Sequence, residues 1–280
     1  MKPDRRRDAV LLLPGLGWLV AFFAIPLGII AVVSVGDRDR FGGVLLGSPS
    51  LDNYLRALDP GFLSTILNSL KYALATTVLA IVIAYPMAYF ISRYGGRRKA
   101  LLLVLVMLPF WTSWVIRTYA WMILLRDNGV LNSALGVVGI GPFQLLNTDV
   151  AVVLGMTYGF LPFTILPLYV AIDRLDPNLV QAARDLYASG RGAFVHVTLP
   201  LTMPGVVAAA ILTFIPTLGD YVTPDLLGGA QTTTIAKVIQ SAFLSSKDWP
   251  FGAALGFLMI ALTIVGTLAG LRFLRREVIG

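Results

Sequence analysis

One arginine and several aromatic residues share an apolar segment in which they could contact a cation. Arg117 interrupts a run that is otherwise free of charge. Four residues on both sides of Arg117 in the sequence are spaced so that they share an adjoining face of a helix: Trp111, Trp114, Thr118 and Trp121. A charge at bilayer depth costs at least about 2.5–3.5 kcal/mol, so Arg117 is expected to face a cavity, a partner charge or the interface. The group either packs against lipid with Arg117 snorkelling outward, or it lines a translocation path whose aromatic faces attract a cation.

A second charge, Asp220, lies where the sequence predicts a broken helix. Pro216 and Gly219 precede it and Pro224 follows, and a helix broken at membrane depth usually lines a cavity. Together with Tyr221, Asp220 is therefore a further candidate for the wall of a translocation path.

Two roles remain open for the Asp220 carboxylate. With Asp225 it could cap an outer helix end, or it could be a gate or pathway acid, paired to Arg117. A paired carboxylate would mainly hold structure, whereas a free one would suit a cationic substrate. A cationic substrate also requires that the charge of Arg117 be neutralised.

Residues that the chain lacks exclude several kinds of chemistry. It has no cysteine, which excludes a disulfide, a zinc–thiolate site and a thiol nucleophile. Its one histidine, His196, lies in a predicted loop, whereas an intramembrane serine protease needs a histidine within the membrane. No Gly-x-x-x-x-Gly-Lys-[Ser/Thr] motif occurs, so ATP hydrolysis by that route is excluded and we expect no cofactor in this chain.

The composition is that of a membrane protein. Of 280 residues, 57% are hydrophobic and 13% are charged, about half the usual charged share of a soluble domain. This excludes a soluble enzyme, a nucleic-acid binder and a disordered chain. We predict an all-α, polytopic protein with one transmembrane domain over residues 1–280. Its six helices are expected near 9–36, 64–92, 100–125, 150–172, 203–227 and 249–271. The first is too long for a signal peptide, so we expect a retained anchor.

Basic residues predict the orientation. Both termini and the loops after the second and fourth spans hold fourteen of the 22 lysines and arginines. Positive charge gathers on the cytoplasmic side, so both termini are predicted to be cytoplasmic. The net charge of +7 is then a topology signal and requires no nucleic-acid partner.

The predicted cytoplasmic loop of residues 173–200 is too long to be a simple connection. Asp176 is a good N-cap, Pro177 fits the first helical position, and Leu175 with Val180 could form a hydrophobic staple. The helix is predicted to run through Tyr187 until Ser189 and the following glycines break it. A second short helix is expected over 193–197, ended by Leu199-Pro200. Three residues share one face of the first helix and could dock against a partner: Leu179, Ala183 and Leu186.

This loop resembles the Glu-Ala-Ala loop of permease subunits of binding-protein-dependent ABC importers. The matching residues are Gln181-Ala182-Ala183-Arg184-Asp185-Leu186-Tyr187-Ala188-Ser189, Phe194 and Thr198-Leu199-Pro200-Leu201. In that family the loop is the coupling helix, which sits in a groove of the ATPase subunit. This sequence departs from the family at two positions, with Gln181 in place of Glu and Tyr187 in place of Gly.

The resemblance extends over nearly the whole chain and is to the spermidine/putrescine branch. The segments that carry it are Leu11-Leu12-Leu13-Pro14, Asn68-Ser69-Leu70, Leu108-Pro109-Phe110-Trp111-Thr112-Ser113-Trp114, Arg117-Thr118-Tyr119-Ala120-Trp121, Gly219-Asp220-Tyr221-Val222-Thr223-Pro224 and Leu226-Leu227-Gly228-Gly229.

The resemblance implies a six-span type I importer permease in the lipid bilayer of the bacterial cytoplasmic (inner) membrane. It implies a second permease subunit of different sequence, two ATPase subunits that bind ATP and Mg, and an extracytoplasmic substrate-binding protein. The leading substrate is a polyamine. The alternatives are a permease of this family for another small organic solute, such as an amino acid or organic acid, and a stand-alone secondary transporter.

The absence of native cysteine makes the predicted orientation testable by single-cysteine labelling. A membrane-impermeant thiol reagent added to intact spheroplasts should label Lys237→Cys or Lys247→Cys and spare Arg98→Cys and Arg191→Cys. Labelling of the second pair with sparing of the first would reverse the topology.

Overall fold

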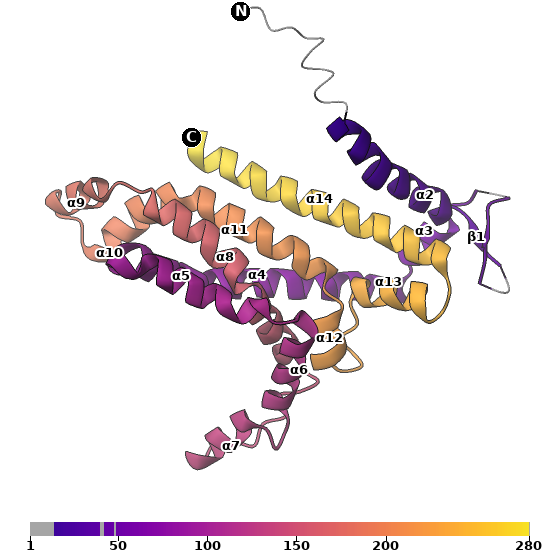
Figure 1. The fold of residues 1–280 in the computed structure, drawn as a ribbon, viewed down its shortest axis with the longest axis horizontal. Helices are drawn as coiled ribbons and strands as arrows, with labels where there is room; N and C mark the ends of the chain where they lie inside the picture. Colours follow the sequence, from indigo (N-terminus) through magenta and orange to yellow (C-terminus); the bar gives the residue numbers. More distant parts are fainter. Residues whose placement is uncertain (1–13, 40–41, 48, 280) are drawn as a thin grey trace, which may run out of the picture. The chain divides into compact units, whose positions relative to one another are not determined.

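Long apolar helices make up most of the chain in the computed structural model, which describes residues 14–39, 42–47 and 49–279 (Figure 1). Five helices among these residues are long and apolar enough to cross a membrane: Pro14–Ser34, Pro60–Tyr94, Asp149–Asp173, Gly190–Gly219 and Trp249–Arg272. A bent pair, Gly96–Trp111 with Trp114–Val137, makes a sixth span if it is counted as one. Some residues used to predict the orientation and the family resemblance lie outside the described residues: Lys2, Arg5, Arg6, Arg7 and Leu11-Leu12-Leu13.

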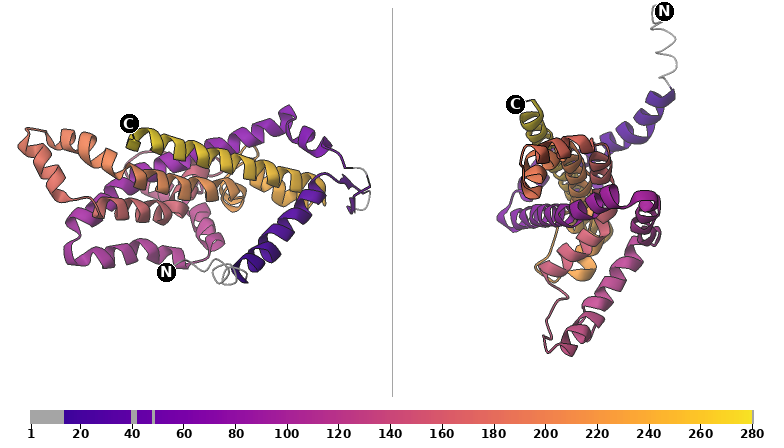
Figure 2. Two further views of the ribbon diagram at one scale, coloured as in Figure 1. Left: turned by 90° about the horizontal axis from the view of Figure 1, so that it is seen from above. Right: turned by 90° about the vertical axis from the view of Figure 1, so that its left-hand side faces the viewer.

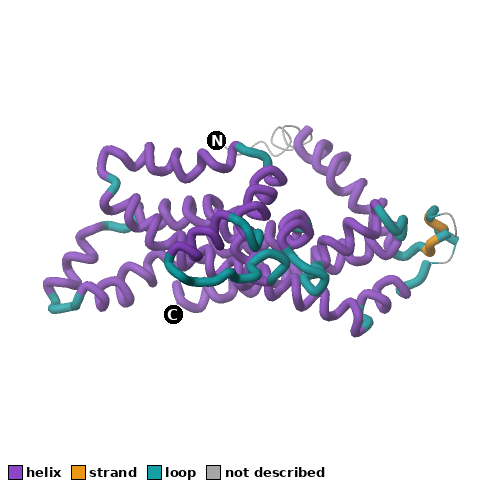
Figure 3. Tube along the Cα trace, turned by 90° about the horizontal axis from the view of Figure 1, so that it is seen from below, coloured by secondary structure: helices purple, strands orange, loops and turns teal. Residues whose placement is uncertain are grey.

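The α-helices in chain order are α2 (Ile25–Ser34), α3 (Asp52–Ala57), α4 (Pro60–Tyr94), α5 (Lys99–Met107), α6 (Trp114–Leu125), α7 (Val130–Val137), α8 (Asp149–Asp173), α9 (Pro177–Asp185), α10 (Gly190–Ala193), α11 (Leu199–Gly219), α12 (Val222–Leu227), α13 (Ile235–Leu244) and α14 (Trp249–Ile279). Short 3-10 or π segments are η1 (Val20–Ala24), η2 (Gly96–Arg98), η3 (Leu108–Trp111) and η4 (Phe194–Thr198). Strand residues within the described part of the chain are confined to β1 (Asp37–Arg38) and β2 (Val44–Leu45) (Figure 3).

The chain forms two compact units, residues 1–63 with 238–260 and residues 64–237 with 261–280. In the first unit, β1 and β2 pair antiparallel, with Asp37 opposite Leu45. Arg56 there donates to the Asp248 carboxylate at 2.8 Å and lies over the Phe251 ring at 4.0 Å from its centroid.

The second unit is built around α8, which contributes to two separate clusters of buried residues. One cluster joins the second half of α8 to α4 and α11 through residues such as Ile165, Ala84 and Ala209. The other joins its first half to α4, α6 and α12 through residues such as Val152 and Tyr72. Burial on several sides explains why this segment carries no charge between its two ends.

Both ends of α8 are tied to α4 or to the hairpin that follows α4. At the first end, the Asp149 carboxylate accepts hydrogen bonds from Lys71 and, at 2.5 Å, from the Tyr72 hydroxyl. At the other end, the Asp173 carboxylate accepts from Ser92 at 3.0 Å and from Lys99 at 2.6 Å. An acid at the first turn also complements the helix dipole.

Small and hydroxylated residues pack α11 against α8. A side chain at Gly205 would meet Ala171, and its Cβ would lie 3.1 Å from the Pro167 carbonyl oxygen. The buried hydroxyls of Thr164 and Thr213 are hydrogen-bonded at 2.8 Å. Close backbone approach and interhelical hydrogen bonds are the usual means of holding helices together in lipid.

The third predicted span is not one straight helix. The sequence led us to expect an unbroken helix over 100–125, but α5 with η3 and α6 meet at a bend of 89°. Pro109 ends the regular α-helix, and Thr112 and Ser113 are extended, with ψ of 153° and 138°. The break predicted in the fifth span is confirmed, since α11 ends at Gly219 and α12 begins at Val222.

Candidate coupling loop and translocation wall

The loop of residues 173–200 begins with the predicted capped helix. The Asp176 carboxylate accepts a hydrogen bond from the Asn178 backbone N–H at 3.0 Å, and Pro177 occupies the first position of α9. Figures 1 and 2 show α9 and α10 projecting beyond the ends of α8 and α11. The N-cap prediction is therefore confirmed.

The helix ends earlier than predicted, at Asp185 instead of Tyr187. The Tyr187 N–H donates to the Arg184 carbonyl and the Ala188 N–H to the Ala183 carbonyl, both at 3.0 Å. This is the Schellman arrangement, which requires a left-handed residue after the helix, and Tyr187 adopts φ of +63°. Glycine usually fills such a position because it has no Cβ. The structure thus explains what the glycine of the resembling family does there, and Tyr187 meets the same backbone demand with a large side chain.

The tip of this loop exposes apolar side chains. Tyr187 is 99% exposed and Leu186 is 81% exposed, and Leu179 on α9 is 47% exposed. No described residue of α9 is buried. Ala183 is half-buried, whereas five other residues of the loop are exposed: Gln181, Ala182, Arg184, Asp185 and Ser189. These exposed apolar side chains make the tip the candidate contact surface of the loop.

The returning arm of the loop differs from the prediction. The expected short helix over 193–197, ended by Leu199-Pro200, is wrong: α10, η4 and α11 run on as one span from Gly190 to Gly219. Pro200 falls in the first turn of α11, where its missing N–H is tolerated. The π-helical turn η4 lies directly before α11, and the Leu199 N–H closes it by donating a hydrogen bond to the Phe194 carbonyl. Ser189 caps α10 by accepting from the Gly192 N–H at 3.1 Å.

Phe194 and Leu199 pack at the base of the loop, away from its exposed tip. The Phe194 ring centroid lies 5.6 Å from that of Tyr85 and 6.4 Å from that of Tyr89, both on α4. The Tyr85 hydroxyl in turn shares a buried 2.8 Å hydrogen bond with Thr202. Leu199 packs against the same core cluster. These contacts join the loop to α4.

The aromatic face of α6 packs against α8. The Trp114 ring centroid lies 4.9 Å from that of Phe160, and the Trp121 centroid lies 5.6 Å from that of Tyr158. Thr118 between the two tryptophans is buried. Gly159 permits the approach, because a Cβ there would lie 2.5 Å from the Trp114 ring.

Trp111 does not belong to this face, contrary to the spacing argument. It lies in η3, before the bend, and is 81% exposed. Phe160 and Tyr158 were missed by sequence reasoning, because the uncharged run over 150–172 gave no sign of which face meets α6. The one sequence feature that could have identified these two residues is that large aromatic rings occur close to two glycines, Gly155 and Gly159.

The ion pair with Arg117, which belonged to one of the two roles left open for Asp220, is not formed among the described residues. The Arg117 guanidinium lies 4.4 Å from the Phe110 ring centroid and 4.9 Å from that of Trp114, and it donates to the Pro109 carbonyl at 3.3 Å. Arg117 is thus stabilised by aromatic faces and a carbonyl of its own bent segment.

The Asp220 carboxylate caps the first turn of α12. It accepts from the backbone N–H groups of Val222 at 2.9 Å and Thr223 at 3.1 Å, and from the Thr223 hydroxyl at 2.5 Å. These bonds hold the acid at the break without a basic partner among the described residues. Asp225, by contrast, forms an ion pair with Lys237 at 2.9 Å.

A pocket of about 280 Å³ opens beside Asp220. Its lining includes Asp220, Trp114, Phe160 and Tyr221, and Tyr221 is 42% exposed. A carboxylate flanked by aromatic faces can hold a primary ammonium group. No three His, Cys, Asp or Glu side chains gather as metal ligands within the described ranges.

Comparisons with known proteins agree with this architecture. The family described as "Binding-protein-dependent transport system inner membrane component" matches residues 77–278. The spermidine/putrescine transport system permease protein PotB of Haemophilus influenzae is 41% identical over 251 residues, covering 89% of this chain and 86% of that protein. The PotB protein of Salmonella typhimurium is 40% identical over 267 residues, covering 95% and 92%.

One solved structure shares the fold over nearly the whole chain. It is a bacterial alginate ABC transporter in complex with an alginate pentasaccharide-bound periplasmic protein, with a TM-score of 0.75 at 20% identity. The match covers 98% of this chain and 96% of that chain.

The separate anchoring of Arg117 and Asp220 can be tested with a double-mutant cycle. In Arg117→Met and Asp220→Asn, the losses in thermal stability should nearly add, with an interaction energy below about 1 kcal/mol. A buried ion pair would instead make each single variant lose about 3–5 kcal/mol and the double variant recover much of it. Such recovery, measured by thermal unfolding of the purified protein, would contradict the geometry.

Proposed function

The chain belongs to the family of binding-protein-dependent transport system inner membrane components, and we propose that it carries a polyamine such as spermidine or putrescine across that membrane. It is a multi-pass permease of an ABC importer with the type I fold, a transport component and not an enzyme. The substrate is proposed from the names of its relatives and from the chemistry of the pocket beside Asp220.

One observation carries the proposal of an amine substrate: Asp220, which has no basic partner among the described residues, lines a pocket together with Trp114 and Tyr221. A polyamine presents primary ammonium groups, which favour a carboxylate and ring faces together. Arg117, the basic partner that the sequence offered for this acid, is held by Phe110 and the Pro109 carbonyl. The runner-up substrate, an organic acid, would be repelled by the same carboxylate.

We propose that the permease works with three kinds of partner. A second permease subunit of different sequence completes the path, and two ATPase subunits supply ATP binding and its Mg. A substrate-binding protein outside the membrane delivers the substrate. With both termini and the loop of residues 173–200 in the cytoplasm, the exposed tip of Leu186 and Tyr187 faces the ATPase subunit. ATP binding there would move the loop and switch the cavity between inward- and outward-facing.

The amine pocket is tested by Asp220→Asn. Asparagine retains an oxygen that can accept from the first turn of α12, so the helix cap survives while the charge is lost. A hydrogen bond to a charged group contributes about 1.5–3 kcal/mol, so spermidine uptake should weaken roughly 10- to 100-fold in apparent affinity.

Asp225→Asn is the matched control, because its carboxylate is paired with Lys237 and lies outside the pocket. Uptake into proteoliposomes by the full transporter measures both variants. Unchanged uptake by Asp220→Asn would remove this pocket from the path.

The coupling loop is tested by Ala183→Arg, which places a long charged side chain on the face of α9 that also carries Leu179. The ATPase subunit should no longer copurify with the permease in detergent, and substrate-stimulated ATP hydrolysis should fall. Ala134→Arg, on the exposed surface of α7, is the control and should retain the ATPase subunit. Normal copurification and coupling by Ala183→Arg would show that another segment contacts the ATPase.

A further inference from the structure

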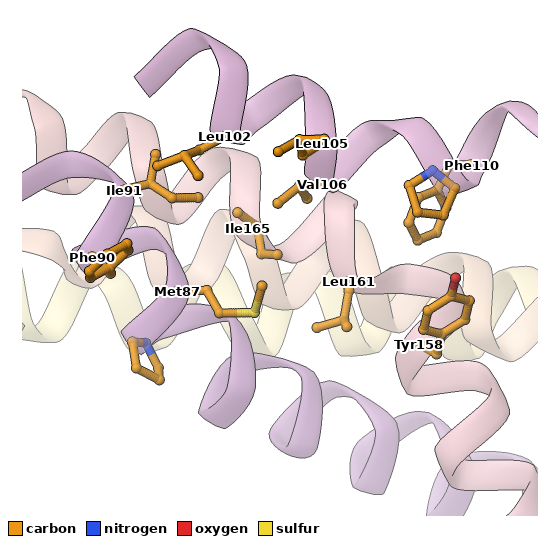
Figure 4. Close-up of a pocket in the computed structure, with 12 residues that line it drawn as sticks. Met87, Phe90, Ile91, Leu102, Leu105, Val106, Phe110, Tyr158, Leu161 and Ile165 are labelled. Carbon is orange, nitrogen blue, oxygen red and sulfur yellow. The ribbon is translucent and has the colours of Figure 1, made fainter. Parts of the chain in front are cut away.

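An apolar groove lies between α4, α5 with η3, and α8. Its volume is about 590 Å³. Figure 4 shows side chains from the three elements pointing into the shared space, among them Met87 on α4, Val106 on α5 and Ile165 on α8. The lining holds no charged residue.

The groove is accessible from outside the chain. Phe90 is 55% exposed and Leu105 is 53% exposed, although both line it. Its lining on α5 and η3 runs from Leu102 to Phe110, nine residues, whose eight steps correspond to about 12 Å along a helix axis. In a membrane, such a groove is filled by lipid or by another apolar element.

The end of the groove at Ile91 and Leu102 is next to the hairpin that joins α4 to α5, residues 95–98. This hairpin is basic, and no Asp or Glu occurs between Asp59 and Asp127. Arg97 and Arg98 are exposed and form no ion pair with any residue that the structure describes.

The other basic residues of this region are already engaged. Arg93 donates to the carbonyls of Ile172 at 3.2 Å and Leu175 at 3.0 Å, and Lys99 is paired with Asp173. Arg174 at the end of α8 is exposed and adds a further positive charge. Hydrogen bonds to carbonyls leave the charge of Arg93 in place, so the net positive charge at this end comes from Arg93, Arg97, Arg98 and Arg174, of which the last three are exposed.

We propose that this groove is a binding site for an anionic phospholipid, with the phosphate of the headgroup at Arg97 and Arg98 and an acyl chain between α4, α5 and α8. An acyl chain needs only apolar walls, which the groove supplies along its whole length. A phosphate is held by arginines at the membrane surface, and anionic lipid is attracted to basic segments beside a span.

The charge beside the groove favours a lipid over a helix of a partner protein. Arg97 and Arg98 form no ion pair with any residue that the structure describes, so they can bind an anionic headgroup. A partner helix would leave the two arginines without an anion.

The proposal is tested with the purified transporter in nanodiscs of phosphatidylcholine that contain a minor share of phosphatidylglycerol. Native mass spectrometry counts the phosphatidylglycerol molecules retained on the complex. Each basic residue near an anionic surface contributes about a fivefold preference, so Arg97→Gln with Arg98→Gln should lower retention roughly 25-fold. Arg126→Gln, an exposed arginine at the far end of α6, is the control and should retain the lipid.

A second variant tests the acyl-chain half of the site. Val106→Trp fills the groove and should displace phosphatidylglycerol while both arginines remain. Equal retention by the arginine double variant and the parent would overturn the proposal. Loss of the partner permease from Val106→Trp, with lipid retention unchanged, would also overturn it and would assign the groove to that subunit.

Discussion

The fixed position of α8 is the constraint on which the rest of the second unit depends. A helix buried on several sides cannot carry charge along its length, so the charged side chains that anchor it lie at its two ends. Asp149 is held there by Lys71 and Tyr72, and Asp173 by Lys99 and Ser92. Because these partners lie on α4 or at the start of α5, α8 is tied to the α4–α5 pair at both of its ends.

This constraint determines how the coupling loop can transmit motion. The loop leaves the anchored end of α8 and returns through Phe194, whose ring packs on Tyr85 and Tyr89 of α4. Tyr85 also bonds Thr202 at the start of α11. A force applied at the exposed tip therefore reaches α4, α8 and α11 together. We infer that these helices and the loop move as one body during transport.

Features decided by local chemistry could be predicted from the sequence, and features decided by tertiary packing could not. The Asp176 cap and the break before Asp220 followed from neighbouring proline and glycine residues, and both were confirmed. The pairing of Arg117 with Asp220 was wrong, because the aromatic rings beside Arg117 supply its stabilisation within its own segment. The inward packing of Phe194 was likewise invisible, since its partners lie about a hundred residues earlier. The sequence showed that Tyr187 stands where the family usually has glycine. Only the positive φ of Tyr187 in the structure shows why glycine is usual at that position.

The most direct test of the one-body account is a distance between the loop and α4 during the ATP cycle. Because the chain lacks cysteine, spin labels can be placed at Asn178→Cys on α9 and Val82→Cys on α4, both exposed positions. Pulsed electron paramagnetic resonance on the full transporter would compare the distance between the two spin labels without nucleotide and with ATP bound. The account predicts that it stays the same while the substrate cavity changes its access. A change in the loop-to-α4 distance on ATP binding would show that the loop moves independently and would contradict the account.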